Sequence, residues 1–198
     1  MGLDLQYGFG QTPVSEEELD ELLIRTITTR KELDEFEQQN IEKALEWLMR
    51  KKISLENFLS EDFIFLLHRK MFGEVWAWAG TQRKSNKNIG VDWTMIRIEL
   101  RNLLDDVRFW IENKVFTQDE ISLRFSHRLV SIHIFPNGNG RHSRLMADIM
   151  AERIFLRPPF TWGSVNLTSQ GEAREAYISA LRLADQNSFA ALIAFARS

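Results

Sequence analysis

The sequence predicts an all-α fold, an irregular bundle of helices that carries one short flap. Apolar residues recur at helical spacing over most of the chain, and only one short stretch has the character of a strand. No repeat, low-complexity segment or Gly/Ser-rich linker interrupts the 198 residues. We therefore expect a single domain over residues 1–198, with N-terminal helices over about 1–55 and a core over about 56–198.

Four segments have the apolar periodicity of helices. In residues 40–52 the apolar face is formed by Ile41, Ala44, Leu45 and Leu48, and in residues 94–112 by Ile96, Leu100, Leu103, Val107 and Trp110. Residues 122–135 are apolar on more than one side, which predicts the central helix of a bundle, through Leu123, Phe125, Leu129, Val130 and Ile132. Residues 171–197 predict two helices separated near 186–188, with Ser188 capping the second.

Residues 81–91 (TQRKSNKNIGV) are the one good candidate for strands. Gly80 and Gly90 bracket this stretch, and residues 86–88 (Asn-Lys-Asn) have the composition of a turn. We expect a short β-hairpin or an extended flap here.

The composition, with 44% hydrophobic and 27% charged residues, is that of a globular protein. No apolar run is long enough to cross a bilayer, and the N-terminus lacks the basic start and apolar core of a secretion signal. We expect a cytoplasmic protein that does not contact a membrane. The absence of cysteine excludes disulfides, thiol nucleophiles and cysteine-based metal sites.

Charge is unevenly distributed along the chain, although the net charge is only −3. Residues 1–62 contain 15 acidic and 7 basic residues, whereas residues 63–198 contain 13 acidic and 18 basic residues. One interpretation is a solvated acidic helix at the front of the chain. The other is that acidic residues near the start face a basic centre that binds anions.

The residues with the clearest chemical meaning form one short bend, His133 to Arg144, with the sequence HIFPNGNGRHSR. Gly138 and Gly140 permit positive φ and the close approach of a ligand to bare amides. A helical pattern resumes after Gly140, so free N–H groups and the positive end of the helix dipole would meet there and bind phosphate. Arg141 and Arg144 share a face of this helix, where both guanidinium groups can bind phosphate oxygens.

The other polar residues of the bend extend this hypothesis. Asn139 can hydrogen-bond an anion through its side-chain amide, and Phe135 can anchor the loop in the core. His133 ends the preceding helix, where a neutral imidazole could accept a proton from an attacking hydroxyl. The alternative is a plain glycine-rich connection, in which His133 binds a carbonyl and the arginines are surface residues.

The remaining histidines and the tryptophans receive structural interpretations. His127 is expected on a helix surface, His142 in a first helical turn and His68 in a packing or capping role, and none has a zinc-binding spacing with the bend. Trp76 and Trp78 are expected to support the core and the flap. Direct contact with nucleic acid is not expected, because the chain is net acidic and has no basic recognition helix.

Residues 133–144 resemble the motif of the Fic (Fic/Doc) family, His-x-Phe-x-(Asp/Glu)-Gly-Asn-Gly-Arg-x-x-Arg. The matching residues are His133, Phe135, Gly138, Asn139, Gly140, Arg141 and Arg144. Asn137 is the only departure. Met71–Arg83 is similar to the segment that leads into the family's target-binding flap, and residues 173–195 are similar to its closing helices. The resemblance implies a Fic-type helical bundle with a short β-hairpin flap.

Most Fic proteins transfer AMP from ATP to a hydroxyl of a target protein, so the resemblance implies a protein adenylyltransferase. His133 would be the catalytic base. The nucleotide would be bound by Phe135, Gly138, Asn139, Gly140, Arg141 and Arg144, with Arg144 at the γ-phosphate. The target would pair with the main chain of the flap, which consists of Arg83, Lys84, Ser85, Asn86, Lys87, Asn88 and Ile89.

Asn137 occupies a position where most active relatives have an acidic residue that holds Mg²⁺. An amide oxygen can bind Mg²⁺ or Mn²⁺, but it brings no negative charge, so the metal would be held weakly or through water and activity would be lower. The alternative is that Asn137 is merely a turn residue that tolerates the left-handed conformation.

A candidate for autoinhibition comes from the N-terminal third of the chain. Many Fic proteins carry the pattern (Ser/Thr)-x-x-x-Glu-(Gly/Asn), whose glutamate pairs with the second motif arginine, here Arg144. Thr28 and Glu32 match this pattern in part, because Leu33 follows the glutamate. The alternative is a capped helix start with surface carboxylates.

The string HIFPNGNGRHSRL also resembles a subgroup named mobile mystery protein B, which implies a toxin–antitoxin-like pairing with a helix-turn-helix DNA-binding partner. Two other functions stay open: a catalytically weak or inactive module that binds nucleotide and a partner, and a Fic enzyme with other nucleotidyl or phosphoryl transfer. Gly140 argues against phosphoryl transfer, because that variant of the family has lysine there. The sequence identifies neither the target nor the oligomeric state.

Overall fold

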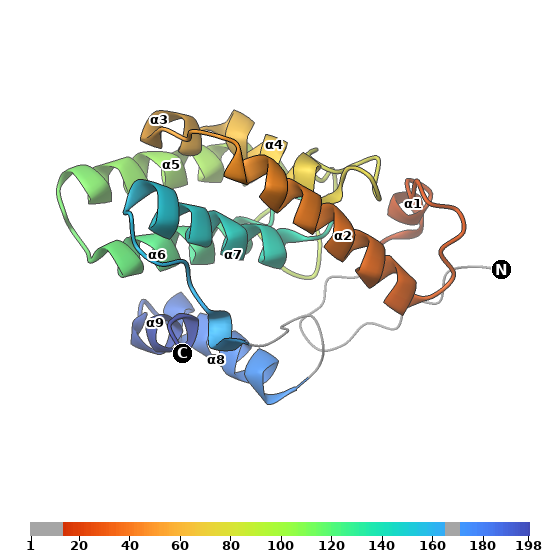
Figure 1. The fold of residues 1–198 in the computed structure, drawn as a ribbon. Helices are drawn as coiled ribbons and strands as arrows, with labels where there is room; N and C mark the ends of the chain where they lie inside the picture. The colour runs from red at the N-terminus through yellow and green to blue at the C-terminus, as the bar shows by residue number, and fades with distance from the viewer. Residues whose placement is uncertain (1–13, 165–170) are drawn as a thin grey trace.

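The computed structural model describes residues 14–164 and 171–198, and its regular elements in these ranges are all helical (Figure 1). The α-helices are α1 (Glu16–Leu19), α2 (Arg30–Met49), α3 (Leu55–Phe58), α4 (Glu61–Phe72), α5 (Ile96–Glu112), α6 (Gln118–Ile132), α7 (Asn139–Ile149), α8 (Glu172–Asp185) and α9 (Ala190–Ala196). Three short helical turns are η1 (Trp93–Met95), η2 (Met150–Ile154) and η3 (Trp162–Ser164). The helical part of the expected fold is therefore confirmed for the described residues.

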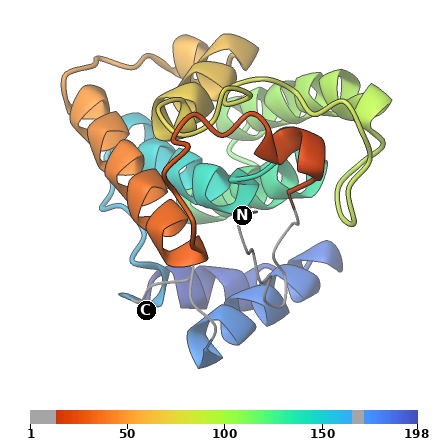
Figure 2. The same ribbon diagram turned by 90° about the vertical axis from the view of Figure 1, so that its right-hand side faces the viewer.

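The helices pack in two groups around α6 and α7. In the first group α2 packs on α4, α4 on α7, and α5 on α6. In the second group α8 packs on α9, and α9 contacts α6. Figures 1 and 2 show the α8–α9 pair as a separate layer on the opposite side of α6 and α7 from α2 and α4.

The central position of α6 is what its sequence predicts, because apolar residues lie on two of its sides. Phe125, Leu129 and Ile132 belong to the larger core, which α6 shares with α4, α5 and α7. Leu123 belongs to the smaller core, to which α8 and α9 also contribute, for example through Tyr177 and Leu192. Burial on both sides fixes the rotation of α6 about its axis, and therefore the direction in which the chain leaves it at residue 133.

Three of the smaller expectations are wrong. Leu45 was expected on the buried face of its helix, but it is 40% exposed, because the buried row of α2 runs through residues 33, 37, 40, 44 and 48. Ser188 does not cap α9, whose first turn is preceded by Phe189 without a side-chain cap. His127 is not a surface residue, because it is 8% exposed and its Nε2 lies 2.8 Å from Oδ1 of Asp185.

The expected β-hairpin is absent, because residues 81–92 form bends and contain no strand. Several main-chain groups of this segment form hydrogen bonds with side chains, where a hairpin would have main-chain bonds between two strands. The Asn86 amide donates to the Asp92 carboxylate and accepts from the Trp93 N–H, and the Arg83 guanidinium takes the carbonyls of Ser85 and Val91. The segment does reverse direction, as its turn residues predict, but side-chain hydrogen bonds and not strand pairing close the loop.

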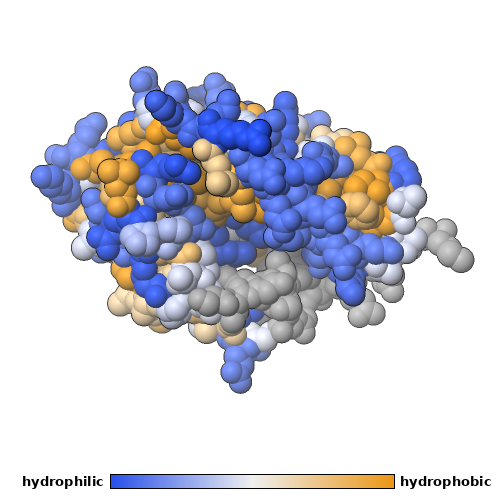
Figure 3. All heavy atoms as spheres, viewed as in Figure 1, coloured by the Kyte–Doolittle hydropathy of each residue, from blue (hydrophilic) through white to orange (hydrophobic). Residues whose placement is uncertain are grey.

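The surface shows no helix that could cross a membrane, since none in the described ranges is both long and apolar enough. Figure 3 shows mainly hydrophilic side chains over one face, interrupted by two hydrophobic areas, one towards α3 and α5 and one towards α1. Isolated hydrophobic residues on a surface are ordinary in monomeric proteins.

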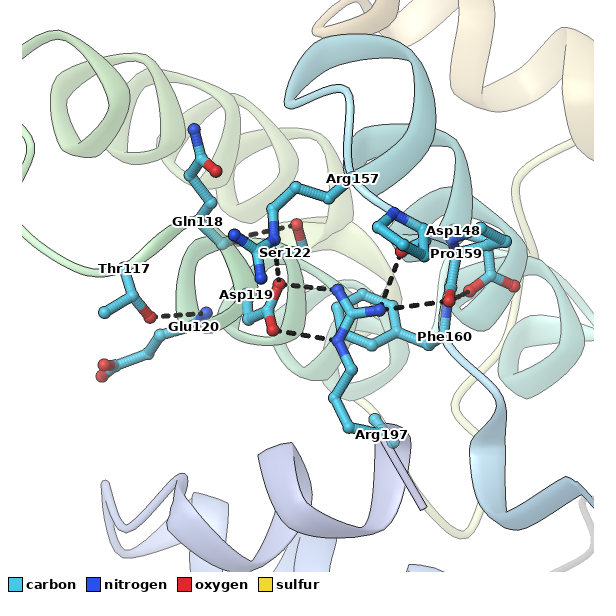
Figure 4. A network of polar contacts seen from close by, with 12 residues as sticks. Thr117, Gln118, Asp119, Glu120, Ser122, Asp148, Arg157, Pro159, Phe160 and Arg197 are labelled. Atoms are coloured by element: carbon cyan, nitrogen blue, oxygen red, sulfur yellow. Dashed lines mark hydrogen bonds and ion pairs between the residues drawn. The ribbon is translucent and has the colours of Figure 1, made fainter.

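The C-terminus is attached to the bundle by Arg197 (Figure 4). The guanidinium donates to both carboxylate oxygens of Asp119 at 2.9 and 2.6 Å, and to the carbonyls of Pro158 and Pro159. It also lies 4.0 Å from the ring centroid of Phe160, and Arg157 is a second partner of Asp119 at 3.2 Å. The start of α6, the loop after η2 and the end of α9 therefore meet at one arginine.

Replacing Arg197 by methionine is expected to lower the free energy of unfolding by roughly 1.5–3 kcal/mol, the usual range for hydrogen bonds to a charged group. Urea denaturation followed by circular dichroism measures the change. The control is Arg153→Met, because Arg153 forms a surface ion pair with Glu152 at 3.6 Å. An equal effect of the two substitutions would contradict the role given to Arg197.

Candidate functional site

The bend between α6 and α7 brings the candidate site residues together. His133 ends α6 with φ 56° and ψ 62°, a left-handed conformation that costs a residue with a Cβ about 1 kcal/mol. The imidazole is buried at the end of the helix. Because the backbone reverses its curvature at this residue, the chain turns out of α6 and returns along α7, which packs against it.

Two buried side chains hold the loop that follows His133. The Asn139 amide accepts from the Phe135 N–H at 3.0 Å and donates to the Phe135 carbonyl at 2.8 Å. The Phe135 ring stacks on His68, with ring centroids 3.7 Å apart. His68 accepts from the Gly80 N–H through Nδ1, so Nε2 carries the proton and donates to the Asn137 carbonyl at 3.0 Å. Phe135 is thus the expected anchor, and His68 has the packing role that the sequence predicts.

The side chain of Asn139 does not have the role that the sequence analysis gave it. It was expected to hydrogen-bond an anion, but it is buried and both ends of its amide are used by Phe135. Asn139 can therefore meet a ligand only through its main-chain N–H at the start of α7.

The first turn of α7 is open. Gly138 precedes it with φ 77°, and no side chain caps the helix. A Cβ at Gly138 would lie 2.6 Å from the Phe72 ring, so glycine is required there. Gly140 is helical and does not use the positive φ that glycine permits, and a Cβ on it would come within 4 Å only of Nη1 of Arg144, at 3.6 Å, among the described residues. An uncapped helix start of this kind is the type of site that can bind an anion.

The two motif arginines have different surroundings. Nη1 of Arg141 lies 2.7 Å from Oε2 of Glu37, and its guanidinium lies 4.7 Å from the Phe72 ring centroid. Arg144 lies 5.3 Å from the Tyr177 ring centroid and forms no salt bridge within the described ranges. A phosphate would therefore have to displace a carboxylate from Arg141 but not from Arg144.

Glu37 is the site residue that the sequence analysis missed. Its carboxylate is 3% exposed, and Oε1 accepts from Trp76 Nε1 at 2.6 Å while Oε2 meets Arg141. A signal for it exists, because Glu37 and Asn40 interrupt the row of apolar residues that α2 buries. A charged residue in a buried row is expected to have a specific partner.

Glu32 lies at the start of α2 and does not contact Arg144. Its carboxylate accepts from the N–H groups of Thr28 and Thr29 and from the Thr28 hydroxyl, and the Thr29 hydroxyl accepts from the Glu32 N–H. These bonds form a capping box, and they lower the pKa of Glu32. Of the two interpretations of Glu32, inhibition through Arg144 or capping of a helix, the structure therefore agrees with capping.

The expected flap residues lie beside the bend, and two of them, Arg83 and Lys87, are covered by other parts of the protein. Lys84, Ser85, Asn86, Asn88 and Ile89 are exposed. Arg83 is instead buried against the end of α6, where it donates to the His133 carbonyl. Lys87 is largely covered, and its ammonium group pairs with Glu18 of α1 at 2.6 Å.

Burial lowers the pKa of His133 to about 4, helped by the positive charges of Arg83 and Lys87 and opposed by a hydrogen bond with the Val130 carbonyl. The imidazole is therefore neutral near pH 7, which is the form that accepts a proton. Burial also lowers the pKa of His142 to about 3 and holds that of His68 well below its usual range. Asp148 differs, because burial raises its pKa to about 7 against the hydrogen bonds from Trp162 and Phe160.

The described residues do not assemble a protein metal site, since no group of three or more His, Cys, Asp or Glu side chains is placed to hold an ion. Asn137 offers one neutral oxygen, and this oxygen already accepts from the Gly138 N–H at 2.6 Å. Its φ is not positive, so the left-handed alternative is wrong as well. A cation would have to be held mainly by the phosphates of a nucleotide.

Comparison with known proteins gives one family and several solved structures. Residues 58–151 match the model of the Fic/DOC family. A structure of Fic-1 from C. elegans is 21% identical with a TM-score of 0.64, over 89% of this chain and 50% of that chain. BepC from Bartonella tribocorum with bound AMPPNP is 16% identical with a TM-score of 0.64, over 92% and 97%. The N-terminal Fic domain of an effector from Bartonella sp. AR 15-3 is 15% identical with a TM-score of 0.66, over 92% and 91%.

At these identities the likeness to solved structures concerns the fold. The chain spans half the length of the C. elegans Fic-1 chain that it matches. No curated protein matches it. The resemblance to mobile mystery protein B is not confirmed by these comparisons.

Lowering the pH from 7 to 5 is expected to destabilise the protein. His68, His133 and His142 stay neutral in the folded state, whereas their counterparts in the unfolded chain bind protons as the pH falls through 6.5. Asp148 acts in the opposite direction. Its pKa is about 7 in the folded protein and 3.8 in the unfolded chain, so between these values the folded state binds a proton that the unfolded state has released. Through this group, lowering the pH stabilises the fold. The three histidines outweigh the one aspartate, so between pH 7 and pH 5 the unfolded state takes up more protons than the folded state, and stability falls.

The urea midpoint measured at pH 7 and pH 5 checks this prediction. The matched variant is Asp148→Asn, which keeps an acceptor for Trp162 and Phe160 but removes the opposing titration, so its midpoint is expected to fall further. A wild-type midpoint that rises at pH 5 would contradict the prediction.

Proposed function

Residues 58–151 of this chain belong to the Fic/DOC family, and on that premise we propose that the protein transfers AMP from ATP to a hydroxyl group of a target protein. One observation carries the proposal. The start of α7 has no side-chain cap and carries two arginines, and it ends the bend that begins with neutral His133. This combination binds a polyanion and supplies one base.

The transfer needs positioning and charge compensation more than covalent help from the protein. The target hydroxyl donates its proton to the imidazole of His133 as its oxygen attacks the α-phosphorus. The new oxygen–phosphorus bond forms while the bond from the α-phosphorus to the bridging oxygen breaks, and pyrophosphate leaves with the electrons of that bond. The first turn of α7, Arg141 and Arg144 hold the phosphates, and a bound cation enters with ATP as part of the substrate.

Two features support the choice of a nucleotide and a protein as substrates. A structure of similar fold, BepC, contains AMPPNP. Lys84, Ser85, Asn86, Asn88 and Ile89 are exposed in a loop whose base lies against His133, so an extended target segment bound along these residues would bring its hydroxyl towards the imidazole. We also propose a helix-turn-helix protein as regulatory partner, and a cytoplasmic location in which ATP is abundant.

ATP labelled at the α- or the γ-phosphate, incubated with the protein alone and with a cell lysate, tests the reaction. We expect protein-bound label from the α position only. His133→Ala is expected to reduce labelling by about 10²-fold or more, as loss of a general base does, while ATP still binds in equilibrium dialysis.

The control for this experiment is His127→Asn, because His127 pairs with Asp185 outside the bend and should not change labelling. Label from the γ position alone would replace the proposal by phosphoryl transfer. ATP binding without either label would favour the alternative of a nucleotide-binding interaction module.

We infer further that Glu37 restrains this activity, in the role first considered for Glu32. Its carboxylate occupies Arg141, and it enters from α2, outside the matched segment 58–151. A phosphate bound to Arg141 would bring its negative charge close to the carboxylate of Glu37, and the repulsion between the two would weaken binding. The phosphate and Glu37 therefore compete for Arg141. Asn40, one turn further along α2, donates to the Lys70 carbonyl and accepts from the Glu74 N–H, which fixes the helix in this position.

Glu37→Gln is expected to raise α-label transfer about tenfold, the effect of one ion pair worth about 1.4 kcal/mol. The amide keeps an acceptor for Trp76 Nε1, so the fold is preserved, but the charge on Arg141 becomes available. The initial rate of self-labelling measures the change. Glu35→Gln, on the exposed face of the same helix, is the matched control, and equal rates in the two variants and the wild type would exclude the restraint.

A further inference from the structure

Arg83 is one of the most deeply buried side chains of the protein, with 1% of its surface exposed. Among the described residues, its guanidinium hydrogen-bonds only to main-chain carbonyls. Nε donates to His133 O at 2.6 Å, Nη1 donates to Ser85 O at 2.7 Å, and Nη2 donates to Val91 O and lies 3.5 Å from Ile132 O.

This placement is unfavourable for a charged group taken by itself. Burial lowers the pKa of Arg83, and the one carboxylate that opposes this shift, Asp92, is not bonded to the guanidinium. A charge buried without an ionic partner costs several kcal/mol unless hydrogen bonds offset the loss of water. A leucine or methionine would fill a similar volume without the free-energy cost of burying a charge. The presence of arginine therefore indicates that its hydrogen bonds have a specific role.

The first set of contacts lies at the end of α6. The last carbonyls of a helix have no partners within the helix, and here those of Ile132 and His133 point to Arg83. The Arg83 N–H also donates to the Ile134 carbonyl at 3.0 Å, so three successive carbonyls meet one residue. Arg83 thereby stabilises the left-handed backbone of His133, which sets the direction of the imidazole.

The second set of contacts closes the loop of residues 85–91. One guanidinium binds the carbonyls of Ser85 and Val91, so the two ends of the loop are held together. Gly90, with φ 102°, then lies against the bend. A Cβ at this position would be 2.6 Å from the Cβ of His133 and 2.9 Å from Nη2 of Arg83. The base of the loop therefore forms a wall against His133.

From these contacts we propose that Arg83 is a positioning residue that fixes the orientation of the His133 imidazole and joins it to the loop 85–91. The proposal rests on the proposed transfer reaction. It replaces the expectation that the target pairs with the main chain of Arg83, because the Arg83 N–H already donates to the Ile134 carbonyl. A target segment bound to the loop and the base that deprotonates it are thereby held at a constant separation by one side chain.

The test uses Arg83→Lys, which keeps a positive charge but cannot bind several carbonyls in fixed directions. In the protein with ¹⁵N-labelled histidine, the His133 ring resonances, assigned with His133→Gln, report its orientation and tautomer without any reaction. We expect these resonances to shift or broaden in Arg83→Lys. We also expect the rate of α-label transfer to fall about 10²-fold, as for a small misplacement of a reacting group, while the Kd for ATP stays within about twofold.

Two further variants make the outcome decisive. Gly90→Ala disturbs the same contact from the side of the loop and is expected to have the same two effects. Arg108→Lys is the control, because Arg108 also donates to a main-chain carbonyl, that of Leu59. Arg108 lies in the second half of α5, near the start of α6 and away from the bend (Figure 1), so this substitution should change neither readout.

Unchanged His133 resonances or an unchanged transfer rate in folded Arg83→Lys and Gly90→Ala would overturn the proposal. Loss of folding in both would also overturn it, because the contacts would then serve the fold alone. If the wild-type protein transfers no label, the proposed reaction fails, and the ring resonances still decide the role of Arg83.

Discussion

The bend between α6 and α7 depends on buried hydrogen bonds from three side chains to the main chain. His68 binds the Asn137 carbonyl, Asn139 clamps Phe135, and Arg83 collects the carbonyls at the end of α6. Main-chain groups at a sharp turn between two helices cannot pair with one another, and leaving them buried without partners would destabilise the fold by several kcal/mol. These bonds fix the backbone of the bend where it enters α7, and they leave uncapped the first turn of α7, whose amides are proposed to bind an anion.

The uneven charge along the chain acquires a meaning in the tertiary structure. Two acidic residues near the start pair with basic residues of the later part of the chain, since Glu37 meets Arg141 and Glu18 meets Lys87. These pairs agree with the second interpretation, and anion binding by the basic centre stays a prediction. Both pairs are at least partly shielded from water, where attraction is stronger than at the surface. The N-terminal elements α1 and α2 therefore lie over the two places where substrates are proposed to bind, the phosphate site and the target loop.

Where the sequence analysis was right, the structural feature followed from local physics. The two apolar sides of α6, the left-handed Gly138 and the open start of α7 all follow from residues within one turn of one another. Where it was wrong, the outcome depended on which groups the folded backbone brings within reach of a side chain, and residue types alone do not fix that. Asn139 binds within the bend rather than a ligand, Leu45 lies beside rather than on the buried row of α2, and the turn residues at 86–88 close a loop through Asp92 and Arg83.

The sequence by itself determined the helical class, the place of the bend and the residues proposed to bind phosphate there, because periodicity, glycine and arginine act over a few residues. Only the tertiary structure decided which glutamate meets an arginine of the site, since Glu32 and Glu37 lie on the same helix and differ in the side that packs against the bundle. It also decided that Arg83 faces inwards. Pairing between distant segments depends on how whole helices pack, and that information is spread over the entire core.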